Sequence, residues 1–221
     1  MQNRLNKDCD DTQRRSLVLS EGLLFIIVPI LLAIIPLALG YWPVALLLLG
    51  IAAFIVFFFR DPDCVPPTEA NVIVAPSHGR ITRIKALEPG NPHAGNVISI
   101  FMSPLDVHVN RAPIAGKITD VTYTKGRLRT AMREDADVTN EQNALTIKGP
   151  QVEVVCKQIA GVLARRIVCW KRAGDHVALG ERFGMIKFSS RTDLVLPPEV
   201  EVVVREGMRV RGGTTIIGRV L

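Results

Sequence analysis

The sequence predicts a mostly β domain that follows an N-terminal helical hairpin able to span a membrane. Three observations lead to this fold class: an uncharged stretch from Gly22 to Phe59, a series of short Val- and Ile-rich runs after Asn71, and two repeated glycine patterns within those runs. A chain of 221 residues can bury a core of its own without disulfides or metal ions. The uncharged stretch excludes an ordinary soluble protein.

The uncharged stretch is too long for a single membrane span. It covers 38 residues, whereas one transmembrane helix needs about 20. The sequence Gly40-Tyr41-Trp42-Pro43 interrupts it and predicts a turn with two aromatic side chains at the far membrane interface. We therefore expect two transmembrane helices, 22–39 and 44–59. The alternative, a cleaved signal peptide, predicts a shorter apolar core followed by a cleavage site and no second span.

Basic residues predict the orientation of this hairpin. Arg14 and Arg15 precede the first helix and Arg60 follows the second, so both flanks are expected in the cytoplasm. Residues 1–21 then form a cytoplasmic N-terminal segment, and the Pro-rich residues 60–70 form a short, stiff linker. The large domain, residues 71–221, is expected at the cytoplasmic face of the cell membrane.

Charge and cysteine content are consistent with this location. The chain has 27 Lys and Arg against 21 Asp and Glu, a net charge of +6, and all of the excess follows residue 59. Such a domain is suited to meet anionic headgroups, although a solvated basic surface explains the excess equally well. The cysteines form no C-x-x-C pair and have no histidine at metal-ligand spacing, which indicates unpaired thiols and no metal site. They are Cys9, Cys64, Cys156 and Cys169.

The domain after Asn71 reads as short strands bounded by Gly, Pro and Asn. This pattern is typical of a mostly antiparallel all-β fold with little room for helices. The predicted strands cover 72–75, 80–84, 97–101, 117–123, 144–148, 152–157, 162–168, 185–188, 200–204 and 215–220.

Two internal echoes indicate repeated β-hairpins. The sequence G-R-I-T-R-I from Gly79 resembles G-K-I-T-D-V from Gly116, and the pattern G-x-x-V-x-x-G-x-x-[FI] begins at Gly174 and again at Gly207. Glycines at such spacing suit the tight corners of a small barrel or sandwich. The second pattern is similar to that of lipoyl- and biotinyl-type barrel-sandwich domains, but no Lys stands where those domains attach a cofactor. We therefore expect a barrel-sandwich-like fold without swinging-arm chemistry.

Two motifs carry the functional interpretation. Residues 182–197 read R-F-G-M-I-K-F-S-S-R-T-D-L-V-L-P, and residues 101–113 read F-M-S-P-L-D-V-H-V-N-R-A-P. The first closely resembles the self-cleavage segment of short-form phosphatidylserine and archaetidylserine decarboxylases, and the second resembles their histidine motif. The hairpin followed by F-F-R-D-P at residues 58–62 also fits, so the resemblance extends from about residue 20 to the C-terminal end.

The resemblance implies a pyruvoyl-dependent decarboxylase made as a proenzyme. In that family a serine hydroxyl attacks the preceding carbonyl, the ester undergoes β-elimination, and the dehydroalanine hydrolyses to an N-terminal pyruvoyl group and ammonia. By motif the nucleophile is Ser190, and cleavage after Ser189 yields a β chain, 1–189, and an α chain, 190–221. The ketone forms a Schiff base with the substrate amine and accepts the electrons left by CO₂. Neither a metal nor pyridoxal phosphate is implied.

The same motifs suggest roles for other residues. His108 can take the serine proton or return a proton to the decarboxylated carbon, since an imidazole ordinarily gains and loses its proton near neutral pH. Arg111 and Arg191 are candidates to hold the lipid phosphate through forked hydrogen bonds, with a structural salt bridge as an equal alternative. His93 and His176 lie in Gly-rich turns outside the motifs, and we expect them at the surface.

Two positions depart from the family pattern. The family usually has Gly at the position of Ser189, and P-A-D-G where this chain has P-S-H-G at residues 76–79. A side chain at Ser189 hinders the backbone angles and close approach that Gly permits, and His78 supplies no negative charge to orient a base. His78 could act as the base itself. Otherwise the chain is a slow or unprocessed precursor.

Three interpretations follow. The first is a membrane-anchored enzyme of phospholipid biosynthesis that converts a serine phospholipid into the ethanolamine phospholipid, with the anchor raising its concentration at the headgroups. The second is an unprocessed pseudoenzyme that binds aminophospholipid headgroups, and the third is a structural barrel-sandwich membrane protein. Ester- and ether-linked lipid chains both remain open, as does a homo-oligomer. No nucleic-acid partner is expected.

Overall fold

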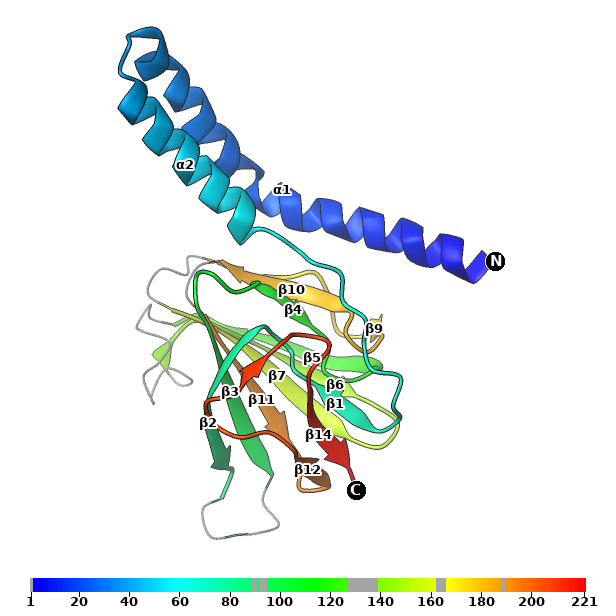
Figure 1. The fold of residues 1–221 in the computed structure, drawn as a ribbon. Coiled ribbons are helices and arrows are strands. Elements are labelled where there is room, and N and C mark those ends of the chain that lie inside the picture. Colours follow the sequence, from blue (N-terminus) through cyan, green and yellow to red (C-terminus); the bar gives the residue numbers. More distant parts are fainter. Residues whose placement is uncertain (1, 89–90, 92–94, 127–138, 162–165, 188–189) are drawn as a thin grey trace. The chain divides into compact units, whose positions relative to one another are not determined.

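The computed structural model describes residues 2–88, 91, 95–126, 139–161, 166–187 and 190–221, with side chains from Ser20 onward. The chain forms two compact units, Met1–Pro62 and Asp63–Leu221. The first is helical and the second is built of strands (Figure 1).

The helical unit is a hairpin of α1 (Gln2–Ala38) and α2 (Trp42–Phe58). The chain reverses within three residues, and the amide of Tyr41 donates to the carbonyl of Pro36 at 2.7 Å. Pro43 lies at the start of α2, where a missing N–H costs no hydrogen bond. Residues Ser20–Ala38 have a mean hydropathy of 2.5 and are long enough to cross a membrane, whereas the apolar helix α2 is shorter, with 17 residues. The predicted pair of N-terminal helices is therefore confirmed.

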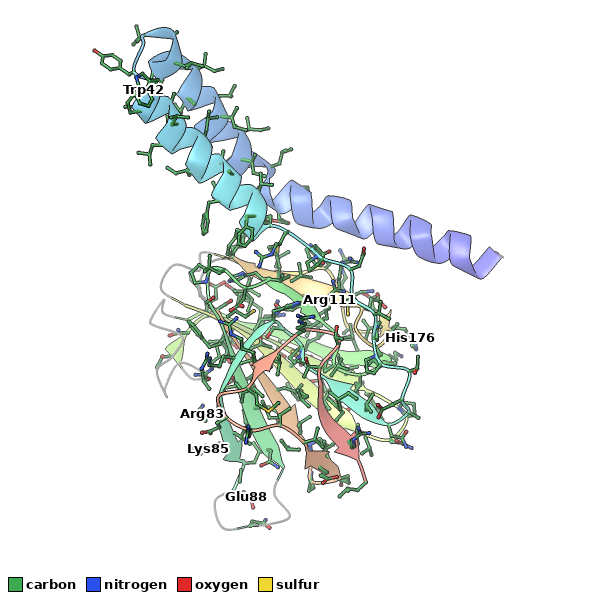
Figure 2. The ribbon with its side chains drawn as sticks, in the orientation of Figure 1. Trp42, Arg83, Lys85, Glu88, Arg111 and His176 are labelled. Atoms are coloured by element: carbon green, nitrogen blue, oxygen red, sulfur yellow. The ribbon has the colours of Figure 1, made fainter. Side chains whose placement is uncertain are left out.

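One glycine allows the two ends of this hairpin to pack closely. A Cβ on Gly22 would lie 2.7 Å from the ring of Phe59, so only a residue without a side chain fits there. Phe59 also stacks on Phe25, with ring centroids 6.4 Å apart. At the other end Trp42 lies next to the turn with its side chain exposed (Figure 2), which is the environment expected for an aromatic residue at a membrane interface.

The second unit consists of three antiparallel sheets. The eight-stranded sheet has the order β13-β2-β3-β11-β7-β6-β5-β9, and the smaller sheets have the orders β1-β14-β12 and β4-β10-β8. The strands are β1 (Val72–Val74), β2 (Gly79–Ala86), β3 (Asn96–Met102), β4 (Val109–Arg111), β5 (Gly116–Thr124), β6 (Gln142–Lys148), β7 (Glu153–Ala160), β8 (Arg166–Cys169), β9 (His176–Val177), β10 (Arg182–Lys187), β11 (Ser190–Leu196), β12 (Val200–Val202), β13 (Arg209–Val210) and β14 (Ile216–Val220).

The hydrophobic core lies between the eight-stranded sheet and the two smaller sheets. Ile98 and Leu194 of the large sheet belong to the same buried cluster as Ile73 and Ile217 of one small sheet and Phe183 of the other. Burying side chains from all three sheets in one cluster stabilises their packing. The predicted mostly β, antiparallel, barrel-sandwich-like class is confirmed.

The strand order shows that this unit is a structural duplication. Read from its two ends, the large sheet places β13, β2, β3 and β11 opposite β9, β5, β6 and β7, and the small sheets β1-β14-β12 and β4-β10-β8 have the same arrangement. Repeat 1 therefore consists of β1–β3 and β11–β14, and repeat 2 consists of β4–β10. Repeat 2 is inserted between the third and fourth strands of repeat 1.

Hydrogen bonds reproduce the duplication in detail. In repeat 1, Ile81 bonds through its amide to Met208 (2.9 Å) and through its carbonyl to Gly207 (2.8 Å). In repeat 2, Ile118 makes the same two bonds, with Asp175 and Gly174, at 2.8 Å each. The turn glycines have positive φ angles of 86° at residue 207 and 99° at residue 174, which explains why glycine recurs there. The echoes in the sequence therefore mark equivalent positions of two seven-stranded repeats.

The strand predictions missed β4, β11 and the two-residue strands β9 and β13 entirely. Strand β11 was not predicted because Arg191 and Asp193 interrupt its apolar pattern. In the structure these two side chains lie on the face of the sheet away from the core and form an ion pair of 2.7 Å with each other. Pairing the charges removes much of the cost of burying them. Of the strand predicted for 162–168, only residues 166–168 lie in the described part of the chain.

Candidate active site

Ser190 is the first residue of β11 and is fully buried. In the sheet it pairs with Met102 of β3 on one side and Ala160 of β7 on the other. Its hydroxyl donates a hydrogen bond to the sulfur of Met102, at an O···S distance of 3.8 Å. Met102, Ala160 and Ile186 form a small apolar cluster, so the hydroxyl lies in a water-poor environment. Ser189 falls outside the described residues.

His108 lies immediately before β4 and its side chain is also fully buried. Its carbonyl accepts the amide of Ile186 at 3.3 Å, which ties it to the end of β10, the strand that leads toward Ser190. Its ring Nδ1 lies 2.9 Å from the carbonyl oxygen of Asp106. Because a carbonyl only accepts, Nδ1 must carry the proton, and in the neutral ring Nε2 holds the lone pair. His108 is therefore oriented as a base at Nε2.

Asp106 holds the turn that presents this histidine. Its carboxylate accepts the amide of Ser103 at 2.8 Å and lies 3.7 Å from Arg209. The motif contained Asp106, but the sequence offered no sign that its backbone carbonyl orients His108. That contact depends on the turn geometry.

His78 has the opposite tautomer from His108. Its Nδ1 accepts the amide of Gly212 at 3.2 Å, so in the neutral ring Nε2 carries the proton. Gly212 is a second residue that sequence reasoning missed, because it lies 134 positions from its partner.

The register of the sheet brings His78 toward Ser190. Arg80 pairs with Phe101, and Ser190 pairs with Met102. His78 and Ser190 therefore lie at the same end of the sheet, two strands apart. Adjacent strands are about 4.8 Å apart, so their backbones are on the order of 10 Å apart.

The duplication gives the domain a second corner that is equivalent to the one around Ser190. Asn71 accepts the amide of Val220 (2.9 Å) as His108 accepts that of Ile186 (3.3 Å), and Ala115 precedes Gly116 as His78 precedes Gly79. Leu194 of β11 pairs with Cys156 of β7 where the repeats meet. Leu194 and Cys156 occupy equivalent positions of the two repeats. Ser190, four residues before Leu194, is therefore equivalent to Val152, four residues before Cys156. The equivalents of the three predicted residues are thus Asn71, Ala115 and Val152.

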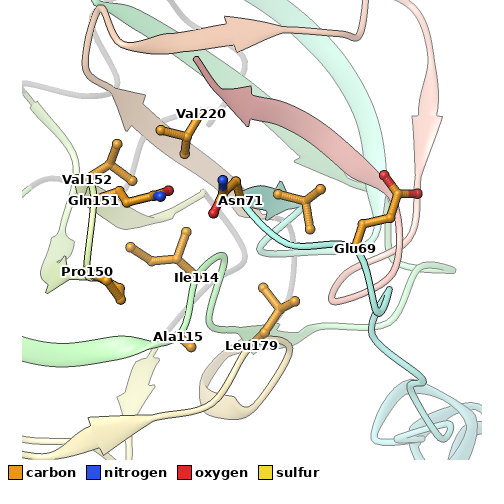
Figure 3. Close-up of a pocket in the computed structure, with 11 residues that line it drawn as sticks. Glu69, Asn71, Ile114, Ala115, Pro150, Gln151, Val152, Leu179 and Val220 are labelled. Atoms are coloured by element: carbon orange, nitrogen blue, oxygen red, sulfur yellow. The ribbon is translucent and has the colours of Figure 1, made fainter.

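These three equivalents line one pocket of about 240 Å³, shown in Figure 3. Ile114, Leu179 and Val220 add further apolar side chains to it. Because the repeats share their topology, we expect Ser190, His108 and His78 to lie around an equivalent corner. The corner at Ser190 carries hydroxyl and imidazole groups, whereas its counterpart carries alkyl and amide groups. Only the corner at Ser190 has side chains suited to nucleophilic and acid–base chemistry.

The two candidate phosphate-binding arginines both bind protein groups. Arg111 is buried, and its guanidinium donates to the carbonyl of Gly180 at 3.1 Å; Figure 2 shows it inside the domain. Arg191 forms two hydrogen bonds with Asp193, of 2.8 and 2.7 Å. These contacts favour the structural alternative for both arginines. Of the two histidines expected at the surface, His176 is exposed, and His93 lies outside the described residues.

The described cysteines have the character of structural thiols. Cys64, Cys156 and Cys169 are free. Burial raises the pKa of Cys156 far above its usual value, and the charge of Asp193 raises it further. Burial likewise raises the pKa of Cys169. Both stay protonated at neutral pH, which makes them poor nucleophiles. Among the residues with described side chains, no three His, Cys, Asp or Glu side chains are grouped to hold a metal ion.

Comparison with known proteins supports the interpretation of the motifs. Residues 51–218 match the family model described as phosphatidylserine decarboxylase. A phosphatidylserine decarboxylase proenzyme of Solibacter usitatus is 44% identical over 203 residues, which cover 91% of this chain and 96% of that protein. One of Symbiobacterium thermophilum is 38% identical, covering 93% and 97%. A candidate archaetidylserine decarboxylase proenzyme of Methanothermobacter thermautotrophicus is 42% identical, covering 79% and 84%. The chain belongs to the phosphatidylserine decarboxylase family of carboxy-lyases.

Proposed function

We propose that this chain is a membrane-anchored proenzyme that cleaves itself at Ser190 and then decarboxylates a serine phospholipid to the ethanolamine phospholipid. The observations that carry this proposal are that Ser190 and His108 are both fully buried and that the equivalents of Ser190, His108 and His78 in the other repeat line one pocket. The contact of His108 Nδ1 with the carbonyl of Asp106 leaves Nε2 as the basic nitrogen of the neutral ring. The names of the relatives, which are proenzymes and act on phosphatidylserine or archaetidylserine, support both the cleavage and the substrate class.

Self-cleavage requires the hydroxyl of Ser190 to attack the carbonyl carbon of Ser189. Nε2 of His108 takes the hydroxyl proton, the new C–O bond forms, and the C–N bond between the two residues breaks, which leaves an ester. Elimination across the Cα–Cβ bond of residue 190 then releases the carboxylate of Ser189. Water replaces the α-nitrogen of residue 190, and ammonia leaves. The products are chains of residues 1–189 and 190–221.

The sheet explains why the two fragments would stay together. Strand β11 opens the small fragment and pairs along its length with β3 and β7 of the large fragment. Strand β14 of the small fragment pairs with β1 of the large one. These hydrogen bonds do not involve the bond that breaks, so cleavage leaves the core intact.

The surroundings of Ser190 fit a pyruvoyl group in its place. Residue 190 is fully buried, and its hydroxyl lies against Met102 of the apolar cluster; a ketone needs no more space than the serine side chain. That group supplies an electron sink for the bond that loses CO₂. In the same site His108 would return a proton to the substrate carbon. The apolar walls exclude water, which would otherwise compete with His108 as the proton donor.

His78 is positioned as a hydrogen-bond donor rather than as the base. Because its Nδ1 accepts the amide of Gly212, Nε2 carries the proton of the neutral ring and is the nitrogen that can donate to the reacting centre. A donor stabilises negative charge on an attacked carbonyl oxygen. An aspartate at this position would instead accept hydrogen bonds and orient a histidine.

We predict that Ser189→Gly preserves or speeds cleavage, because it removes a hindering side chain next to the attacked carbonyl. His78→Asp should act in the same direction if a carboxylate is the better partner of the base. The measurement is the time course of fragment appearance on denaturing gels, with Ser20→Gly, outside the site, as the control for a serine-to-glycine change. Slower cleavage in Ser189→Gly than in the parent chain would contradict the hindrance argument.

A second candidate function is an unprocessed pseudoenzyme that binds aminophospholipid headgroups, and Ser189 and His78 are the residues that favour it. Intact mass of the purified protein separates the two functions. A single uncleaved species without activity, rescued by Ser189→Gly alone or with His78→Asp, identifies a blocked precursor.

The proposed reaction is tested by release of CO₂ from serine phospholipids in vesicles. We expect release to track the fraction of cleaved protein. Vesicles with ester-linked acyl chains and vesicles with ether-linked isoprenoid chains are compared, because nothing in the domain shows which tails are preferred. No CO₂ from either lipid with fully cleaved protein would refute the proposal.

We further propose that both helices span the cell membrane with the β domain in the cytoplasm, on the evidence of the basic residues that flank the hairpin. Tyr41→Cys should then react with a membrane-impermeant maleimide added to intact cells. The parent chain is the control, because its four cysteines all lie in segments expected in the cytoplasm, where the impermeant reagent does not reach them. Extraction of the protein by alkaline carbonate alone would contradict a membrane-spanning anchor.

A further inference from the structure

A basic hollow lies on the face of the large sheet away from the core. It has a volume of about 510 Å³ and is formed by β2, β3, the start of β11 and the turn that precedes β13. The described residues that line it are Arg80, Ile81, Thr82, Arg83, Ser99, Phe101, Arg191, Glu206 and Gly207. The hydroxyl of Ser190 points to the opposite face, toward Met102 and the core. The hollow is therefore separate from the corner that contains Ser190.

Strand register places the charges of the hollow side by side. Arg83 pairs with Ser99, and Arg80 pairs with Phe101, which in turn pairs with Arg191. Figure 2 shows Arg83 on β2, and Lys85 follows on the same strand. The three arginines thus gather over adjacent strands.

Two of these arginines supply uncompensated positive charge. Arg191 is neutralised by Asp193, and Glu206 is turned to the backbone, where it accepts the amide of Ile84 at 2.7 Å. Within the described part of the chain, Arg80 and Arg83 make no ion pair. Two guanidinium groups against one carboxylate leave a net positive lining, which attracts an anion.

Ser99 adds a polar group that a surface patch would not have. It is 1% exposed, and its hydroxyl makes no hydrogen bond within the described residues. Burying a hydroxyl without a partner is costly, whereas a ligand oxygen in the hollow would satisfy it. Phe101 provides an apolar wall beside it.

We infer that this hollow binds a phosphate group, with the guanidinium groups of Arg80 and Arg83 and the hydroxyl of Ser99 as donors. Guanidinium groups match phosphate oxygens in charge and geometry, and the net positive lining favours an anion. The phosphate belongs either to free inorganic phosphate or to the headgroup of an anionic lipid. The inference does not depend on cleavage or on decarboxylation.

The test uses full-length protein in nanodiscs of phosphatidylcholine and measures the midpoint of thermal unfolding. One arm adds inorganic phosphate; the other includes phosphatidylglycerol, which is anionic and has no amine. A ligand that binds only the folded state raises the midpoint. Arg83→Gln should weaken phosphate binding about tenfold or more, and Ser99→Ala should weaken it several-fold. Arg172→Gln makes the same charge change at an exposed site outside the hollow and should have no effect.

A saturable rise with inorganic phosphate supports a site open to free phosphate, and a rise with phosphatidylglycerol alone supports a lipid headgroup site. No rise in either arm overturns the inference. An equal response of Arg83→Gln, Arg172→Gln and the parent chain also overturns it, because the effect would then come from general charge. Since Ser190 lies outside the hollow, fragment analysis of the same samples keeps this outcome distinct from any failure of self-cleavage.

Discussion

Ser190→Ala is expected to leave the purified protein as a single chain of 24.3 kDa. The parent chain should instead yield fragments of residues 1–189 and 190–221. Alanine has no hydroxyl to attack the carbonyl of Ser189, so the loss of cleavage should be complete rather than partial. Decarboxylation should disappear with it, because the group that takes up the electrons is made from residue 190. The measurement is intact mass, supported by denaturing electrophoresis.

The same experiment contains a matched control. Ser99 is another buried serine, on a strand adjacent to β11, but its side chain faces away from the core. Ser99→Ala should cleave like the parent chain. The small fragment of the parent should resist N-terminal sequencing, because a pyruvoyl group has no amine. Cleavage that persists in Ser190→Ala but disappears in Ser189→Ala would show that the neighbouring serine is the nucleophile.

Replacing His108 should have the second largest effect. Loss of a positioned base lowers rates by about 10²–10⁴, so His108→Ala should slow both cleavage and CO₂ release by factors of this size. His176 lies exposed and outside the motifs (Figure 2), and His176→Ala should retain normal rates. Comparable losses in both variants would contradict the assignment.

A second replacement at His108 distinguishes chemistry from folding. In the other repeat the equivalent position is occupied by Asn71, whose backbone makes the equivalent hydrogen bond. His108→Asn should therefore fold, with a thermal midpoint close to that of the parent chain, and should still lose activity because an amide is not a base at neutral pH. Normal activity in folded His108→Asn would remove His108 from the mechanism.

Several features followed from local sequence, because the forces that produce them act over a few residues. The hairpin of helices results from a long apolar stretch with a Gly-Pro break, and the turn glycines 174 and 207 adopt the positive φ that their recurrence indicated. The two motifs located Ser190 and His108, although their roles remain predictions. Strand β11 escaped because Arg191 and Asp193 compensate each other only once both are placed on one face of the sheet.

The sequence alone thus determined the class of fold, the pair of N-terminal helices, the family motifs and the two echoes. Only the tertiary structure showed that the echoes belong to two seven-stranded repeats, one inserted into the other. It also decided the tautomers, since Nδ1 of His108 meets a carbonyl while Nδ1 of His78 meets an amide. The bond between Gly212 and His78 joins residues 134 positions apart and depends on how the strands pair, which no local pattern encodes. The contact of His108 with Asp106 spans only two residues, but it depends on a turn whose geometry the sequence does not specify.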